Sequence, residues 1–293
     1  MAQGDAWEIS LAAPIRNYRF NQWGPKVEDG PMFWEPHADQ TTTEMVNCGG
    51  RAAAYGAGSV AYCPFTQWMG QGSLPPTSIY LDSVIKQRSS HGVWPSIQTY
   101  LHDGTTSNTK WFVDQGAQAD WTVGRSTAVG PYTNSHSCRV YVWPKEASAN
   151  FSVAEWVVRY TPSTWSTNGY ETLSSFPDPD GLHYGPILKG TLKRTDDSFA
   201  SWYSPDNRAE KWSLRVSYSN ITDADYQTLR KYYMANRGGW DGVPRPVAIR
   251  PYLLASGDVG GPEVLVGLFT SFDFQPTGGI GSYWSGSFTL EEM

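Results

Sequence analysis

Residues 220–239 read NITDADYQTLRKYYMANRGG, and this stretch has the clearest helical pattern in the sequence. Thr222 followed three residues later by Asp225 forms an approximate capping box, with Asp in place of the usual Glu or Gln. Apolar residues recur after it at helical spacing, namely Tyr226, Leu229 and Tyr233. Gly238 then supplies a residue type that commonly ends helices. The pattern predicts a helix over 222–237.

The sequence around this helix consists of short strand-like segments separated by turns. The segments before the helix are 78–87, 95–104, 110–114, 119–124, 138–144 and 150–160. Those in the second half are 187–199, 210–219, 246–256, 263–274 and 282–292. Asp103-Gly104 is a turn signal between two of them. Strands at this spacing with one helix predict a mainly β protein.

A change in composition suggests two domains. Residues 161–186 are rich in Ser, Thr, Pro and Gly, as linkers and surface connections are. We therefore predict an N-terminal β-sandwich of the jelly-roll type over 1–165 and a linker over 166–186. A smaller α+β barrel domain that contains the helix then covers 187–293.

The overall composition limits the function classes. The 293 residues include 22 basic and 28 acidic side chains, a net charge of -6, and neither half offers a basic face for nucleic acid. The 14 Trp, 17 Tyr and 11 Phe supply large apolar surfaces for a core. The first residues lack the pattern of a signal peptide, and no window is apolar enough to span a membrane. We expect a non-secreted chain with no membrane span and no nucleic-acid partner.

The three cysteines, Cys48, Cys63 and Cys138, are an odd number without metal-type spacing. Free buried thiols are the simplest interpretation, and one disulfide stays an open alternative.

No residue pattern indicates catalysis. Asp178 and Asp180 lie in DPDPDG, which lacks the downstream Glu of a calcium loop and therefore predicts a turn. The five histidines are scattered without ligand spacing, and neither a phosphate loop nor a dinucleotide motif is present. We predict no catalytic residues, no metal site and no cofactor.

Tryptophans mark the best candidate binding residues. Four of them lie on or beside strands of the first domain: Trp94, Trp111, Trp121 and Trp143. Exposed aromatic rings stack on the apolar faces of sugar rings, so these residues are candidates for glycan binding. The alternative is that the rings fill the space between two sheets.

With these segments in place, both halves resemble known families. The order SIYLDSVIKQ, IQTYLHDGTTSNTKWFVD, ADWTVG, CRVYVWP and FSVAEWVVRY resembles carbohydrate-binding-module jelly rolls, which occur in polysaccharide-degrading enzymes and phage tail proteins. The order KWSLRVSYSNITDADYQTLRKYYMANRGG followed by a closing SFTLEEM resembles the ring-forming barrel domain of phage tail-tip and distal tail proteins.

The resemblance implies a structural component of a bacteriophage virion tail or baseplate, made in the host cytoplasm. The second domain would assemble around the tail axis as a trimer or hexamer, with Tyr226, Leu229 and Tyr233 at the subunit interface. Its partners would be tail tube, hub and fibre proteins, while the first domain projects outward and contacts host glycans. The alternatives are a stand-alone glycan-binding module and a polysaccharide depolymerase.

Overall fold

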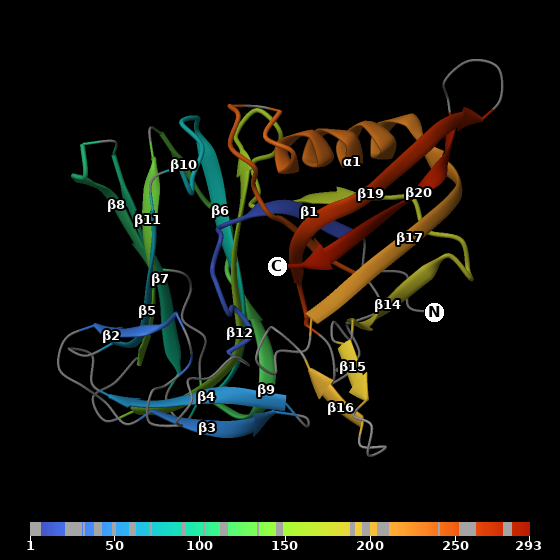
Figure 1. The fold of residues 1–293 in the computed structure, drawn as a ribbon. Helices are drawn as coiled ribbons and strands as arrows, with labels where there is room; N and C mark the ends of the chain where they lie inside the picture. The colour runs from blue at the N-terminus through green and yellow to red at the C-terminus, as the bar shows by residue number, and fades with distance from the viewer. Residues whose placement is uncertain are drawn as a thin grey trace.

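The computed structural model of the protein describes residues 7–20, 31, 33–37, 43–48, 51–58, 63–70, 72–89, 92–101, 103–111, 117–133, 135–144, 149–187, 191–194, 200–203, 211–239, 241–251, 262–277 and 283–293. Within these residues the chain is mainly β-structure with one α-helix, which confirms the predicted fold class (Figure 1).

The strands form two large sheets and one small one. The larger sheet contains β1 (Trp7–Ala12), β3 (Thr43–Cys48), β4 (Arg51–Gly58), β6 (Ile79–Ser89), β9 (Gln118–Arg125), β10 (Val129–Tyr132), β12 (Ala149–Pro162), β13 (Glu171–Leu173), β14 (Leu182–Ile187), β17 (Lys211–Thr222), β18 (Val247–Arg250), β19 (Leu265–Thr277) and β20 (Tyr283–Glu292). The five-stranded sheet has the order β2 (Glu35–His37), β5 (Cys63–Met69), β11 (Ser137–Pro144), β7 (Val93–Tyr100), β8 (Thr106–Trp111). A separate hairpin pairs β15 (Thr191–Arg194) with β16 (Ala200–Tyr203).

The five-stranded sheet packs against β4, β6 and β12 of the larger sheet to make the predicted β-sandwich (Figure 1). Alternation along β11 places Val140 and Val142 in the core with no exposed area. Across the layer, Phe65 on β5 meets Phe151 on β12 edge to face, with ring centroids 5.8 Å apart.

The C-terminal strands β14, β17, β18, β19 and β20 form a curled antiparallel half-barrel, and α1 (Asp223–Asn236) lies across one end of it (Figure 1). Alternate residues of β17 point into its core, namely Leu214, Val216 and Tyr218. Among the described residues, no helix has the length and apolar character needed to cross a bilayer.

The helix begins and ends as the sequence predicts. The Thr222 side chain accepts a hydrogen bond from the Asp225 backbone N–H at 3.2 Å, which caps the first turn. At the other end Gly238 has a φ of +78°, a left-handed conformation that costs little without a Cβ. Hydrogen bonds from Gly239 to the carbonyl of Met234 and from Gly238 to that of Ala235 complete a Schellman motif.

The first described strand joins the sandwich to the half-barrel. β1 pairs with β12 of the sandwich and also with β18 of the half-barrel, so one sheet runs through both. All six residues of β1 are buried. This sharing of one sheet was not predicted, because a six-residue segment buried on both faces carries no strand-specific signal.

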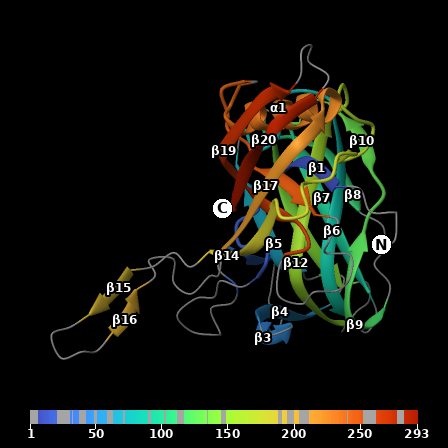
Figure 2. The ribbon, with the colours of Figure 1, turned by 90° about the vertical axis from the view of Figure 1, so that its right-hand side faces the viewer.

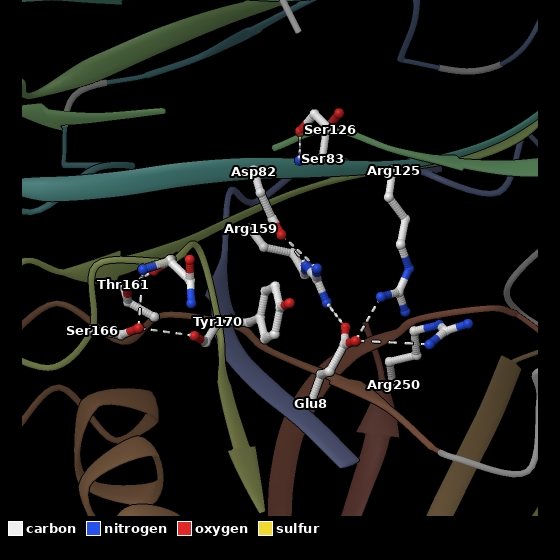
Figure 3. A network of polar contacts seen from close by, with 11 residues as sticks. Glu8, Asp82, Ser83, Arg125, Ser126, Arg159, Thr161, Ser166, Tyr170 and Arg250 are labelled. Carbon is white, nitrogen blue, oxygen red and sulfur yellow. Dashed lines mark hydrogen bonds and ion pairs between the residues drawn. The ribbon is translucent and has the colours of Figure 1, made fainter. Parts of the chain in front are cut away.

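Charged side chains lie buried where β1 crosses the sandwich (Figure 3). The Arg159 guanidinium donates from Nη1 to Glu8 at 2.5 Å, and from Nε and Nη2 to Asp82 at 2.8 and 2.5 Å. Arg125 donates to the other oxygen of Glu8 at 2.7 Å, and Arg250 lies 3.8 Å from that oxygen. Two carboxylates, those of Glu8 and Asp82, thus join five strands: β1, β6, β9, β12 and β18.

Burial and neighbouring charges shift the pKa values of Glu8, Arg159 and Asp82. Burial opposes ionisation of Glu8, but Arg159 and Arg125 outweigh it and lower the pKa of this carboxyl below its ordinary value. Burial likewise opposes the charge of Arg159, yet the attraction of Asp82 and Glu8 raises the pKa of the guanidinium. For Asp82 burial dominates over Arg159 and raises the pKa.

The stretch predicted as a linker, 166–186, contains β13 and the start of β14, which pair with β1 and β17. Between them, the Asp225 carboxylate accepts hydrogen bonds from the backbone N–H and the hydroxyl of both Ser174 and Ser175, at 2.6 to 3.2 Å. This segment is therefore tied to the half-barrel over most of its length. The division into two domains itself stays a prediction.

The predicted strand over 187–199 is shorter in the structure. β14 ends at Ile187, and β15 covers Thr191–Arg194 within the small hairpin. Figure 2 shows that β15 and β16 extend away from the rest of the protein.

Replacing Arg159 with Met should lower the free energy of unfolding by about 3–5 kcal/mol, because Asp82 and Glu8 would be left buried without their main partner. Urea unfolding of Arg159→Met and wild type measures this loss. Arg215 is exposed on β17 and provides the control, since Arg215→Met should change stability by less than about 0.5 kcal/mol. Equal stability of both variants would contradict a structural role for the network.

The Asp225→Asn variant should lose about 2 kcal/mol of stability at neutral pH, since hydrogen bonds to a charged acceptor are lost. Burial raises the pKa of Asp225, but hydrogen bonds from Ser175 and Ser174 outweigh it and lower the pKa below 3.8. The ionised carboxylate therefore stabilises the fold above pH 3.8, and this contribution disappears as the pH falls through the lower folded-state pKa. Urea unfolding at several pH values should show the difference between variant and wild type shrinking below pH 3.8; a constant difference would refute this explanation.

Candidate functional site

The five-stranded sheet has one face in the core and one face directed away from it. The inner residues are buried: Phe65, Met69, Ile97, Cys138, Val140 and Val142. Because side chains alternate along strands, the intervening residues of β5, β7 and β11 share the opposite face. We call this opposite face the outer face; its described residues on these three strands include Thr66, Trp68, Ser96, Gln98, Tyr100, Ser137, Arg139, Tyr141 and Trp143.

Two aromatic pairs lie on the outer face. Trp68 is 50% exposed and meets Tyr100 edge to face, with ring centroids 4.8 Å apart. Farther along β11, Tyr141 and Trp143 stack with centroids 5.8 Å apart. The half-exposed Trp68 is notable, because large apolar rings on a sheet surface commonly mark binding sites.

Hydrogen bonds organise the polar groups between these pairs. The hydroxyls of Tyr100 and Tyr141 donate to the Gln98 side-chain carbonyl at 2.5 and 2.9 Å. The Arg139 Nε donates to the Thr66 hydroxyl at 3.0 Å, and the guanidinium carbon lies 5.5 Å from the centre of the Tyr141 ring. The outer face therefore combines a fixed set of polar groups with aromatic rings.

The structure brings some of the four predicted tryptophans together. Trp143 is on the outer face and half buried. Trp94 is its backbone partner on β7, and Trp111 on β8 is the partner of Ser96. These strand positions adjoin the outer face, but the side chains of Trp94 and Trp111 lie outside the described residues.

Trp121 lies elsewhere, on β9 of the larger sheet, where the Arg88 guanidinium covers its ring at 5.3 Å. The sequence predicts no strand over 63–69, so Trp68 is not among the candidates. No period-two pattern marks it, because Thr66 and Gln67 are both polar while Trp68 and Met69 are both apolar.

The three helix residues predicted to contact another subunit take different positions. Leu229 is fully buried, so its side chain has no exposed area for such a contact. Tyr226 is half buried and stacks on Trp284 with centroids 3.8 Å apart, and Tyr233 stacks on Phe272 at 4.5 Å. The helix thus packs mainly against its own sheet, with two tyrosines at the margin.

Two carboxylates outside the outer face have structural partners. Glu155 is fully buried and accepts from the backbone N–H of Glu263 and Val264, each at 2.9 Å. Asp178 accepts from the backbone and hydroxyl of Ser219 at 3.0 and 2.8 Å, within the predicted turn. Within the described part of the chain, no three His, Cys, Asp or Glu side chains form a group that could hold a metal ion.

Cys138 is a free thiol in the core, as predicted, and burial raises its pKa to about 12. The Cys48 and Cys63 side chains lie outside the described residues.

A cavity of about 720 Å³ lies between loops of the sandwich and the connection from α1 to β18. Its lining includes Leu74, Leu101, His136, Val243 and Arg245. Asp241 neutralises Arg245 through hydrogen bonds of 2.5 and 2.6 Å. The cavity is open to solvent, and none of the outer-face residues lines it.

No protein-family model matches the sequence, and no curated protein matches it. Among solved structures, the chain is similar to the xylanase 10B CBM22-1–GH10 modules of Clostridium thermocellum, complexed with xylohexaose (TM-score 0.39, 11% identity, 50% of this chain and 28% of that one). It is also similar to the CBM22-1 xylan-binding domain of Paenibacillus barcinonensis Xyn10C (TM-score 0.39, 11% identity, 54% of this chain and 98% of that domain). A third is the enzymatically active domain of bacteriophage CBA120 tailspike protein 4 (TM-score 0.37, 9% identity, 52% of this chain and 21% of that one).

Proposed function

We propose that this protein binds a polysaccharide on the outer face of the five-stranded sheet. The observation that carries the proposal is the half-exposed Trp68 beside the hydrogen-bonded groups of Gln98 and Arg139. Aromatic rings cover the apolar faces of sugar rings, and fixed polar groups bind the hydroxyls.

The layout of the outer face suits a chain rather than a single sugar. Trp68 is the backbone partner of Arg139, and Trp143 follows Arg139 by four residues on β11, about 13 Å along the strand. Successive sugar units can therefore contact the exposed Trp68 and the half-buried Trp143 while the polymer continues beyond the sheet.

Trp68→Ala should weaken polysaccharide binding about thirtyfold, because truncating a central aromatic contact costs about 2 kcal/mol. Affinity electrophoresis against a panel of soluble neutral and acidic polysaccharides, followed by calorimetry on the polymers that retard the wild type, measures this effect. Trp121→Ala is the matched control, since this ring is on the other sheet under Arg88; its affinity should not change.

The proposal fails if the wild type binds no polymer in the panel, or if Trp68→Ala binds as tightly as the wild type while both remain folded. In this proposal the chain binds glycans without cleaving them. Release of reducing ends from a bound polymer by the wild type would instead favour a depolymerase.

A second candidate function is assembly into a bacteriophage tail, with the half-barrel forming contacts between copies. The observation in its favour is a row of incompletely covered aromatic rings beside α1. These are Tyr226, Tyr233, Phe272, Phe274, Trp284 and Tyr283, the last 51% exposed. Tyr226 and Tyr233 belong to the helix that carries the resemblance to tail proteins, and the rings of β19 and β20 lie beside it. Exposed apolar rings of this kind favour protein contacts. In such a virion the outer face would be available to glycans of the host.

Light scattering after size exclusion should show a discrete trimer or hexamer, because a closed ring requires a fixed number of copies. Tyr283→Ser should reduce this mass, whereas Phe33→Ser should not, since Phe33 is 44% exposed on the sandwich side. A monomer over a wide concentration range would contradict self-assembly through this surface.

A further inference from the structure

We infer that the polysaccharide is acidic, and that Arg139 binds a carboxylate of its uronic-acid units. This inference rests on the proposed glycan-binding function and assigns the substrate class of the same site. It comes from the position of Arg139, from its hydrogen bonds and from the ionisable groups around it.

Arg139 occupies the middle of the outer face. It lies on β11, the central strand of the sheet, with Trp68 as its backbone partner on one side and Gln98 on the other. A sugar stacked on Trp68 would therefore have this guanidinium beside it. The side chain is half buried, so its charge is screened less than that of a fully exposed arginine.

Contacts within the sheet fix the orientation of Arg139 but use only one edge of its guanidinium. Nε donates to the Thr66 hydroxyl at 3.0 Å, and the Tyr141 ring lies beneath the group. Within the described part of the chain, neither Nη group of Arg139 has a hydrogen bond or an ion pair. The pair of Nη groups presents parallel N–H donors, which match the two oxygens of a carboxylate.

Other arginines of this protein do have carboxylate partners. Arg159 binds Asp82 and Glu8, Arg19 binds Glu292, and Arg245 binds Asp241. Arg139 instead meets a neutral hydroxyl. A carboxylate supplied by a ligand would give it the kind of partner that these arginines have within the fold.

The Gln98 side chain beside Arg139 is held by contacts within the sheet. Its carbonyl accepts from the hydroxyls of Tyr100 and Tyr141, and its amide Nε2 approaches the Thr106 hydroxyl on β8 at 3.5 Å. Because β8 lies on the side of β7 away from β11, these contacts leave the Nη groups of Arg139 to a ligand. A carboxylate only accepts hydrogen bonds, so it matches paired N–H donors without bringing a donor of its own.

Among the described residues, the acidic Glu35 lies at the margin of this face. Glu35 is exposed on the edge strand β2, where it is the backbone partner of Thr66. No ion pair joins Glu35 to Arg139. Its charge would oppose an acidic ligand weakly, so Glu35→Gln provides a variant with the opposite expected effect.

The experiment compares polymers that differ only in their carboxylates. Polygalacturonate, alginate and heparosan are each tested beside their carboxyl-reduced neutral forms, by calorimetry with wild type, Arg139→Gln, Arg139→Lys, Glu35→Gln and Trp68→Ala. Thermal unfolding of each variant verifies that it folds.

The wild type should bind at least one acidic polymer about tenfold or more tighter than its reduced form, as expected for a charge-assisted hydrogen bond. Arg139→Gln should abolish this preference, because it should weaken binding of the acidic form more than binding of the reduced form. Arg139→Lys should keep part of it, because the charge remains but the paired donors are lost. Glu35→Gln should bind the acidic form equally or more tightly. Raising the salt concentration from about 0.01 M to about 1 M should weaken only the acidic interaction in wild type.

Two results would overturn the inference: equal affinity of the wild type for acidic and reduced polymers, including no binding of either, or an unchanged preference in Arg139→Gln. Trp68→Ala separates this failure from that of the proposed function. If it loses binding to neutral polymers that the wild type binds without preference, glycan binding stands and the acidic specificity falls. If no polysaccharide depends on Trp68, the binding function falls with it.

Discussion

The fold depends on β1, a strand with both faces buried that pairs on one side with the sandwich and on the other with the half-barrel. Its backbone cannot leave either partner without exposing unpaired N–H and C=O groups. The buried carboxylate of Glu8 on this strand adds a second constraint, since it is bound by arginines from β9 and β12 (Figure 3). On the half-barrel side of the junction, Glu292 on β20 binds Arg19, which follows β1 in the chain. Hydrogen-bonded backbone and buried charge therefore fix the same junction.

Local signals in the sequence predicted local structure well. The cap at Thr222, the glycine at the end of the helix and the strands over 138–144 and 210–219 each depend on neighbouring residues, and the structure confirms them. Long-range partners were not predictable in this way. The polar composition of 166–186 suggested a linker, whereas Ser174 and Ser175 use their polar groups to bind Asp225. Composition gives the hydrogen-bonding capacity of a segment and leaves its partners undetermined.

In the candidate site, too, local features were predictable from the sequence and long-range neighbours were not. The sequence predicts Trp143 as a binding residue, because it is a tryptophan on a predicted strand. Only the pairing of β5, β7 and β11 shows that Trp68, Gln98 and Arg139 are neighbours on one face. These three residues are far apart in sequence and share no motif. Trp121 has a similar sequence context to Trp143 yet belongs to the other sheet. Sheet register, which sets these neighbours, is determined by the whole core rather than by any one segment.

The continuous sheet through β1 affects how several copies of the protein would bind one polymer. Because the sandwich and the half-barrel share hydrogen-bonded strands rather than a flexible tether, the outer face keeps one orientation relative to α1. In any assembly of copies joined beside α1, all outer faces would be held at fixed separations and angles. A polymer engaged by one copy would then meet the next at a high effective concentration, provided that the spacing matches its repeat. Weak contacts with single sugars would add up to strong adhesion on surfaces with the right spacing and to little on others.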